Sequence, residues 1–130
     1  MTRSLRAWIP ALMWAATIFV LSSLPGSAYP ATNLVNADKL VHLALYGLLG
    51  ALCARGFVHD RRRGLALALA LAALLSSLYG VSDELHQAFV PGRNSDWRDV
   101  VADAVGSLLG AALYTSWAAR RRGGGVGAAR

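Results

Sequence analysis

Apolar residues occur along this chain in four long blocks that are separated by short polar segments. The blocks cover residues 7–24, 40–58, 65–81 and 100–119. Each holds roughly 17–20 residues, which at about 1.5 Å per helical residue gives about 25–30 Å, close to the hydrocarbon thickness of a bilayer. No segment shows the alternation that is typical of a strand. The pattern predicts an all-α fold, a bundle of four transmembrane helices.

The composition indicates the same class of protein and a single domain. The chain has 130 residues, of which 55% are hydrophobic and 15% are charged. Such a content would leave too little polar surface for a soluble domain of this size, whereas it suits a membrane protein. We expect residues 1–122 to form one four-helix membrane domain, and the glycine-rich residues 123–130 to form a disordered tail.

The net charge of +6 is distributed unevenly between the segments that flank the blocks. If the helices alternate in direction, most arginines fall on one side of the membrane. These are Arg3, Arg6, Arg55, Arg61, Arg62, Arg63, Arg120, Arg121 and Arg122. The positive-inside rule then places both termini in the cytoplasm. The arginines are expected to set this topology and to contact anionic lipid, so no nucleic acid is expected as a partner.

The first block also has features of a cleavable signal peptide, because Arg3 and Arg6 precede it and the small residues 26–28 follow it. Its apolar core of about 18 residues is longer than the 7–15 usual for a signal peptide. We therefore expect it to be retained as a helix. Cleavage would leave three spans and would not move the acidic segment described next.

Ionisable residues are concentrated in residues 82–103, between the third and fourth blocks. This segment, SDELHQAFVPGRNSDWRDVVAD, contains five acids, two arginines and one histidine. Ionisable groups in or at the edge of a membrane are costly, so they seldom occur without a partner or a function. The segment is where the function is expected to reside.

On the second predicted helix, Asp38, His42 and Tyr46 recur every four residues and share one face. A carboxylate one turn from an imidazole can fix its tautomer and raise its basicity. The alternative is a capping aspartate with a histidine and a tyrosine at the membrane interface.

The third predicted helix is expected to continue beyond its apolar block to about residue 89. Asp83, His86 and Gln87 then lie on one face, with Glu84 pointing further round the helix. The alternative is an ordinary solvated helix end, which would explain Glu84 more easily than the other three.

The fourth predicted helix, capped by Asn94 or Ser95, carries its acids along one side. Asp96, Asp99 and Asp103 follow i, i+3, i+7 spacing, and Gly106-x-x-x-Gly110 continues this side and permits a neighbouring helix to approach closely. Asp103 is about one turn inside the membrane, where a carboxylate needs a partner. The candidate partners are Arg93, Arg98, Lys39, His42 and His86.

Three helix ends thus point polar residues at one outer face. The groups suited to catalysis by proton transfer are Asp83, His86 and Asp103. The residues expected to bind a ligand are Asp38, Lys39, His42, Tyr46, Glu84, Gln87, Arg93, Asp96 and Asp99. Histidines and carboxylates can hold a metal, yet no HExxH or comparably spaced motif occurs, so neither a metal nor another cofactor is expected.

The motifs DKLVHLALYGLLG (38–50), SDELHQ (82–87) with PGR (91–93), and the aspartates that precede Gly106-x-x-x-Gly110 resemble the VanZ-like family. They span roughly residues 38–113. The resemblance implies a multi-pass protein of the bacterial cytoplasmic membrane. The founding member is associated with resistance to teicoplanin, a lipid-tailed glycopeptide that acts on cell-wall precursors outside the membrane.

Three functions are compatible with these features. In the first, the protein is an enzyme that acts on an envelope lipid or lipid-linked precursor, with Asp83 or His86 as general base and Arg93 holding an anionic group. In the second, it binds a lipid headgroup or lipoglycopeptide without catalysis. In the third, it is a small transporter with Asp103 as a proton relay. Because four short helices offer little room for alternating access, a transporter would require a homo-oligomer.

Overall fold

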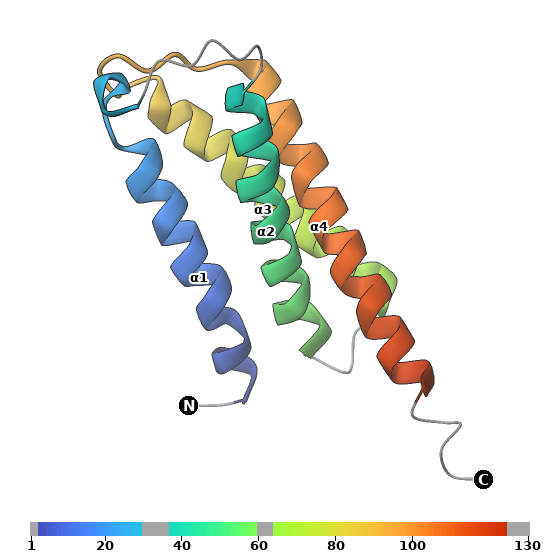
Figure 1. Ribbon diagram of the computed structural model, residues 1–130. Coiled ribbons are helices and arrows are strands. Elements are labelled where there is room, and N and C mark those ends of the chain that lie inside the picture. The colour runs from blue at the N-terminus through green and yellow to red at the C-terminus, as the bar shows by residue number, and fades with distance from the viewer. Residues whose placement is uncertain (1–2, 30–36, 60–63, 125–130) are drawn as a thin grey trace, which may run out of the picture.

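A computed structural model of the chain describes residues 3–29, 37–59 and 64–124. The helices are α1 (Arg3–Ser22), the short 3-10 helix η1 (Gly26–Ala28), α2 (Ala37–His59), α3 (Leu65–Gln87) and α4 (Trp97–Gly124) (Figure 1). The described residues contain no strand. All four α-helices are long and apolar enough to cross a membrane. The predicted all-α bundle of four candidate membrane spans is therefore confirmed.

Each helix extends beyond its apolar block at one end or at both, although α1 ends at Ser22, two residues before the end of its block. α3 reaches Gln87, close to the predicted extension. α4 reaches Gly124, so the first two residues of the predicted tail are helical. The arginine-rich segment 60–63 and residues 125–130 lie outside the described residues.

α2 and α4 form the most extensive helix pair of the bundle. A Cβ atom added at Gly110 would overlap the carbonyl oxygen of Gly47, and one at Gly106 would overlap the carbonyl oxygen of Leu43. The two backbones therefore touch along this seam. The close approach predicted from Gly106-x-x-x-Gly110 is confirmed, and α2 is the partner helix.

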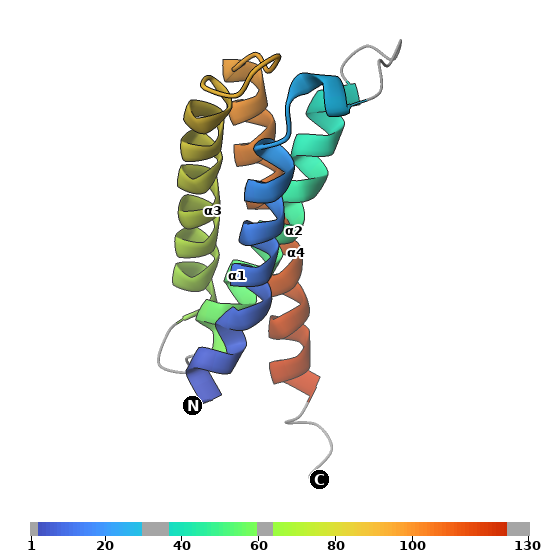
Figure 2. The ribbon, with the colours of Figure 1, turned by 90° about the vertical axis from the view of Figure 1, so that its left-hand side faces the viewer.

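α1 packs mainly on α2 and makes fewer contacts with α3 (Figure 2). Its attachment is partly polar: Trp14 Nε1 donates to the carbonyl oxygen of Leu45 at 2.9 Å, and Tyr79 Oη donates to that of Ala15 at 2.8 Å. These bonds tie α1 to α2 and α3 at mid-height, and they leave the upper part of α1 to line the cavity described below.

The start of α1 and the end of α4 lie at the same end of the bundle, as alternating helices require (Figure 1). We call the opposite end, which holds residues 23–29 and 88–96, the loop end. Exposed aromatic rings occur at both ends: Phe89 and Trp97 at the loop end and Trp117 toward the other. Such rings are typical of the membrane–water interfaces. That both termini face the cytoplasm remains a prediction from the arginines.

Candidate functional site

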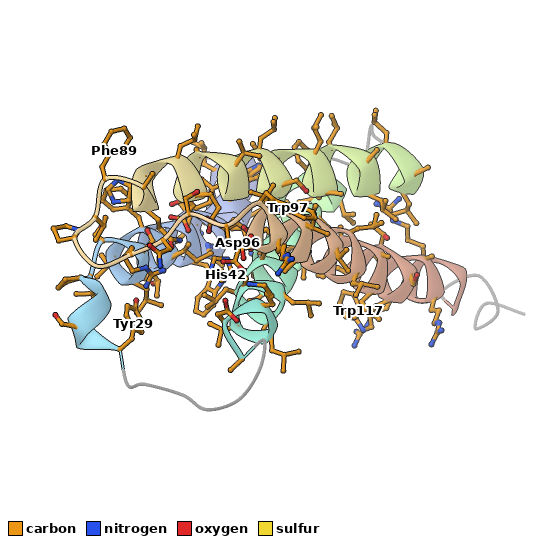
Figure 3. All side chains as sticks on the ribbon, turned by 90° about the horizontal axis from the view of Figure 1, so that it is seen from above. Tyr29, His42, Phe89, Asp96, Trp97 and Trp117 are labelled. Carbon is orange, nitrogen blue, oxygen red and sulfur yellow. The ribbon has the colours of Figure 1, made fainter. Side chains whose placement is uncertain are left out.

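Polar side chains from α2, α3 and α4 are buried together below the loop end. Figure 3 views the bundle from this end, with His42 and Asp96 toward the middle and Phe89 pointing outward. The buried polar residues here are His42 on α2, Asp83, Glu84 and Gln87 on α3, and Asp99 and Asp103 on α4, each no more than 9% exposed. Sequence reasoning had selected all six, so the structure brings together the predicted faces of three helices.

His42 and Asp103 form the innermost pair of this cluster. The Nδ1 atom of His42 lies 2.9 Å from Oδ1 of Asp103 and 3.9 Å from Oε1 of Glu84. Asp103 is 0% exposed. Gly80 of α3 provides room for this carboxylate, since a Cβ atom at position 80 would lie 2.8 Å from Oδ2 of Asp103. The carboxylate that orients His42 is thus Asp103, whereas Asp38 is exposed and bonds to Lys39.

Two carboxylate oxygens of the cluster have no hydrogen-bond partner among the described residues. They are Oε1 of Glu84 and Oδ2 of Asp103. The hydroxyl of Ser107, one turn further along α4, is also buried without a hydrogen-bond partner among the described residues. A buried polar atom without a partner is unfavourable, by about 1–3 kcal/mol and more for a charged group. A cation or additional hydrogen-bond donors near these oxygens would therefore stabilise the cluster.

Lys39 joins the starts of α2 and α4. Its Nζ atom lies 2.8 Å from Asp38, 2.9 Å from Asp99 and 3.2 Å from Asp96. Asp99 is buried and Lys39 is half-buried, so this ion pair neutralises one acid of the cluster and fixes the register of the two helices.

Asp96 caps α4, in place of the predicted Asn94 or Ser95. Its Oδ1 atom accepts a hydrogen bond from the backbone N–H of Arg98 at 2.9 Å, as an N-cap side chain does. This bond, together with Lys39, holds the pKa of Asp96 below its ordinary value. The backbone N–H of Asp96 donates to Oε2 of Glu84 at 3.1 Å, which ties the start of α4 to the end of α3.

A chain of hydrogen bonds leads from the loop end to Asp83. Arg93 donates to Oε1 of Gln87 through Nε at 3.2 Å and through a terminal nitrogen, and Nε2 of Gln87 donates to Oδ2 of Asp83 at 3.0 Å. The Arg93 guanidinium also lies 4.7 Å from the ring centre of Tyr29. Arg93 therefore reaches Asp83 only through Gln87, and sequence reasoning missed the contact with Tyr29.

His86 lies apart from the cluster. Its ring stacks on Phe19 of α1 with centroids 4.9 Å apart, and its Nε2 atom is 3.0 Å from the Ser23 hydroxyl. At about 100° per residue, Glu84 and His86 stand on opposite flanks of Asp83. Glu84 faces α4, whereas His86 faces α1. The role predicted for His86 as a base stays a prediction, with no buried acid among its described hydrogen-bond partners.

A cavity of about 470 Å³ opens beside the cluster, between the upper half of α1 and the other helices. Ile18, Leu21, Val41 and Leu45 contribute apolar lining. The polar lining comes from Ser22, Tyr29, Asp38, His42, Tyr46, Asp83, Gln87, Arg93, Asn94 and Asp99. His42 belongs both to the cavity wall and to the buried cluster, whereas Glu84 and Asp103 lie behind it. The cavity is therefore lined by both apolar and charged side chains.

Comparison with known proteins gives one result. The model of the VanZ/LLP1 family matches residues 4–118, which includes most of each of the four helices and the whole cluster. Searches of curated proteins and of solved structures found no match. Because the family model covers most of the chain, this membrane protein belongs to the VanZ/LLP1 family.

Proposed function

We propose that the cavity binds the anionic headgroup of an amphiphilic envelope molecule, a lipid or a lipid-linked precursor, at the outer leaflet. The observation that carries the proposal is the mixed lining, which includes the apolar side chains of Ile18, Leu21 and Val41 as well as the cationic Arg93 and the imidazole of His42. Its volume of about 470 Å³ lies within the range of about 300–1,000 Å³ that is usual for small-molecule sites.

Arg93 is the residue best placed to select an anionic group. A guanidinium has five N–H donors, and its fork matches phosphate and carboxylate oxygens. The guanidinium of Arg93 donates to the neutral side chain of Gln87, and no carboxylate among the described residues forms an ion pair with it. Lys39, in contrast, is occupied by three aspartates.

Catalysis in the same cavity is the second candidate, and the His42–Asp103 pair favours it. A buried carboxylate 2.9 Å from Nδ1 of His42 can fix the imidazole so that its other nitrogen accepts a proton. His42 lines the cavity, so a bound molecule would meet this imidazole. Under this proposal the base is His42, which replaces Asp83 and His86 as the first choice.

The biological role that fits this site is a contribution to glycopeptide resistance in a bacterial cytoplasmic membrane, with the loop end outside. Support comes from the charge distribution and from membership of the VanZ/LLP1 family. A transporter stays the less favoured alternative. The residues that line the cavity all lie toward the loop end, so the cavity does not form a path across the bundle.

Binding can be measured by native mass spectrometry of the full chain released from nanodiscs of neutral lipid. Dioctanoyl phosphatidic acid should bind in preference to dioctanoyl phosphatidylcholine, and Arg93→Gln should remove the preference. Arg98→Gln is the matched control, because Arg98 lies at the same end but stacks on exposed Trp97. Equal binding of both lipids by the unmodified chain would contradict the proposal.

Catalysis and biological role need separate measurements. His42→Gln should keep lipid binding and lose any turnover of a lipid-linked substrate, whereas a pure binding protein would keep its phenotype with this substitution. Expression in a glycopeptide-sensitive bacterium should raise the inhibitory concentration of teicoplanin, and Arg93→Gln should cancel the increase at equal protein level.

A further inference from the structure

We propose that His42, Glu84 and Asp103 form a site for one divalent transition-metal ion, Zn²⁺ or Mn²⁺. One nitrogen of His42 and one carboxylate oxygen from each acid lie within 4.8 Å of one another. The three residues come from α2, α3 and α4, and all are buried. This inference goes beyond the proposed binding of a headgroup and does not depend on it. It is an alternative to the role of His42 as a base, because a neutral imidazole that binds a metal through Nδ1 carries its proton on Nε2.

The free carboxylate oxygens are the first argument. Oε1 of Glu84 and Oδ2 of Asp103 are buried without a hydrogen-bond partner among the described residues. The residues themselves are 3% and 0% exposed, so solvent cannot satisfy these atoms by simple exposure. Metal coordination is one of the few ways in which proteins compensate buried carboxylates.

The balance of charge is the second argument. Four acids of the cluster are almost completely buried from solvent: Asp83, Glu84, Asp99 and Asp103. Lys39 pairs with Asp99, and Asp83 accepts a hydrogen bond from Gln87. Among the ion pairs of the described residues, Glu84 and Asp103 meet only His42. One imidazole carries at most one positive charge, whereas a divalent ion would match both carboxylates and leave His42 neutral as a ligand.

The distances need only small adjustments. Metal–ligand bonds of about 2.0–2.2 Å in tetrahedral geometry place ligand atoms about 3.3–3.6 Å apart. His42 Nδ1 lies 2.9 Å from Oδ1 of Asp103 and 3.9 Å from Oε1 of Glu84, on either side of this range, and all three ligand atoms lie within 4.8 Å of one another. The cavity wall at His42 provides an entry path for the ion.

The ligand set also narrows the choice of ion. One imidazole nitrogen with two carboxylates suits Zn²⁺ and Mn²⁺, while Mg²⁺ and Ca²⁺ prefer oxygen ligands alone. The sequence led to the opposite expectation, that no metal is bound, because the three ligands lie on separate helices and leave no local spacing motif.

Metal content is the direct test. The full chain in detergent, stripped with a chelator and dialysed, is incubated with Zn²⁺, Mn²⁺ or Mg²⁺, passed over a desalting column and analysed by elemental mass spectrometry. We expect about one Zn²⁺ or Mn²⁺ per chain, a higher Tm with that ion, and little retained Mg²⁺. Glu84→Gln and Asp103→Asn should each lose the ion, whereas Asp38→Asn, which removes an exposed carboxylate at the same end, should keep it.

A spectroscopic measurement on the unmodified chain covers the case in which a variant fails to fold. Co²⁺ in place of Zn²⁺ should give visible d–d bands that an excess of Zn²⁺ abolishes. For variants that fold, the Tm without metal should be equal to or above that of the unmodified chain, because each removes a buried negative charge. A purely structural role would lower this Tm instead.

The proposal is overturned if the unmodified chain retains neither ion and shows no Co²⁺ bands, or if Glu84→Gln and Asp103→Asn keep the ion. No lipid is needed in these measurements. Their failure therefore leaves the headgroup proposal standing, and loss of the phosphatidic acid preference leaves the metal site standing.

Discussion

Gly80 of α3 faces the carboxylate of Asp103 on α4, and a Cβ atom at position 80 would lie 2.8 Å from Oδ2 and 2.9 Å from Cβ of that aspartate. The absence of a side chain at one residue therefore creates the space for a buried acid on the neighbouring helix. Two of the three proposed metal ligands, His42 and Asp103, owe their contact to this space, because a displaced Asp103 would move away from Nδ1 of His42.

Gly80→Ala should destabilise the protein despite alanine's higher helix propensity. Overpacking in a tight interior costs about 1–3 kcal/mol, and the gain in propensity offsets up to about 1 kcal/mol of it. We expect a net loss of about 1–2 kcal/mol in the free energy of unfolding, measured by denaturant titration in detergent. Gly123→Ala is the control, since nothing lies within 4 Å of a Cβ atom there. Equal stability of both variants would contradict the contact.

The α2–α4 seam allows a matched pair of substitutions. A Cβ atom at Gly110 would overlap the carbonyl oxygen of Gly47, whereas one at Gly47 would lie 3.5 Å from the carbonyl oxygen of Gly106, an ordinary contact. Gly110→Ala should therefore lower the free energy of unfolding by about 1–3 kcal/mol. Gly47→Ala should be neutral or slightly stabilising. The reverse order in thermal unfolding would show that the helices do not meet as described.

The fold could be predicted from the sequence more fully than the site. Four apolar blocks of membrane-spanning length determine the number of helices, and the charged segments identify the loop end. The rotation of α3 about its own axis was not predictable, because polar residues lie on both sides of Asp83: Glu84 on one side and His86 on the other. Spacing alone favoured His86, yet Glu84 is the residue that joins the cluster. Gly80, one turn before Glu84, was the overlooked signal, because a small residue there lets α4 approach on that side.

Lys39→Met should destabilise the junction of α2 and α4. Asp99 is 8% exposed in its side chain and would lose its only ion-pair partner among the described residues. Because Lys39 itself is 20% exposed, solvent screens part of the effect, and we expect a loss of about 1–3 kcal/mol. Adding Asp99→Asn to Lys39→Met should restore part of the stability, since the unpaired charge is then gone. A double-mutant cycle by thermal unfolding measures this coupling, and strict additivity would argue against the pair.

His86→Phe and His42→Gln separate the two histidines, of which the sequence favoured His86 for proton transfer. His86 stacks on Phe19 and bonds to the exposed Ser23 hydroxyl, so phenylalanine can keep the stacking at the cost of one hydrogen bond. We expect a change in stability of less than about 1 kcal/mol and unchanged metal content. His42→Gln removes a buried imidazole next to two acids, and it should abolish metal retention. Elemental mass spectrometry of the two variants, prepared in parallel, decides between them. Metal lost from His86→Phe and kept by His42→Gln would move the functional centre from the α2–α3–α4 cluster to the α1 side of α3.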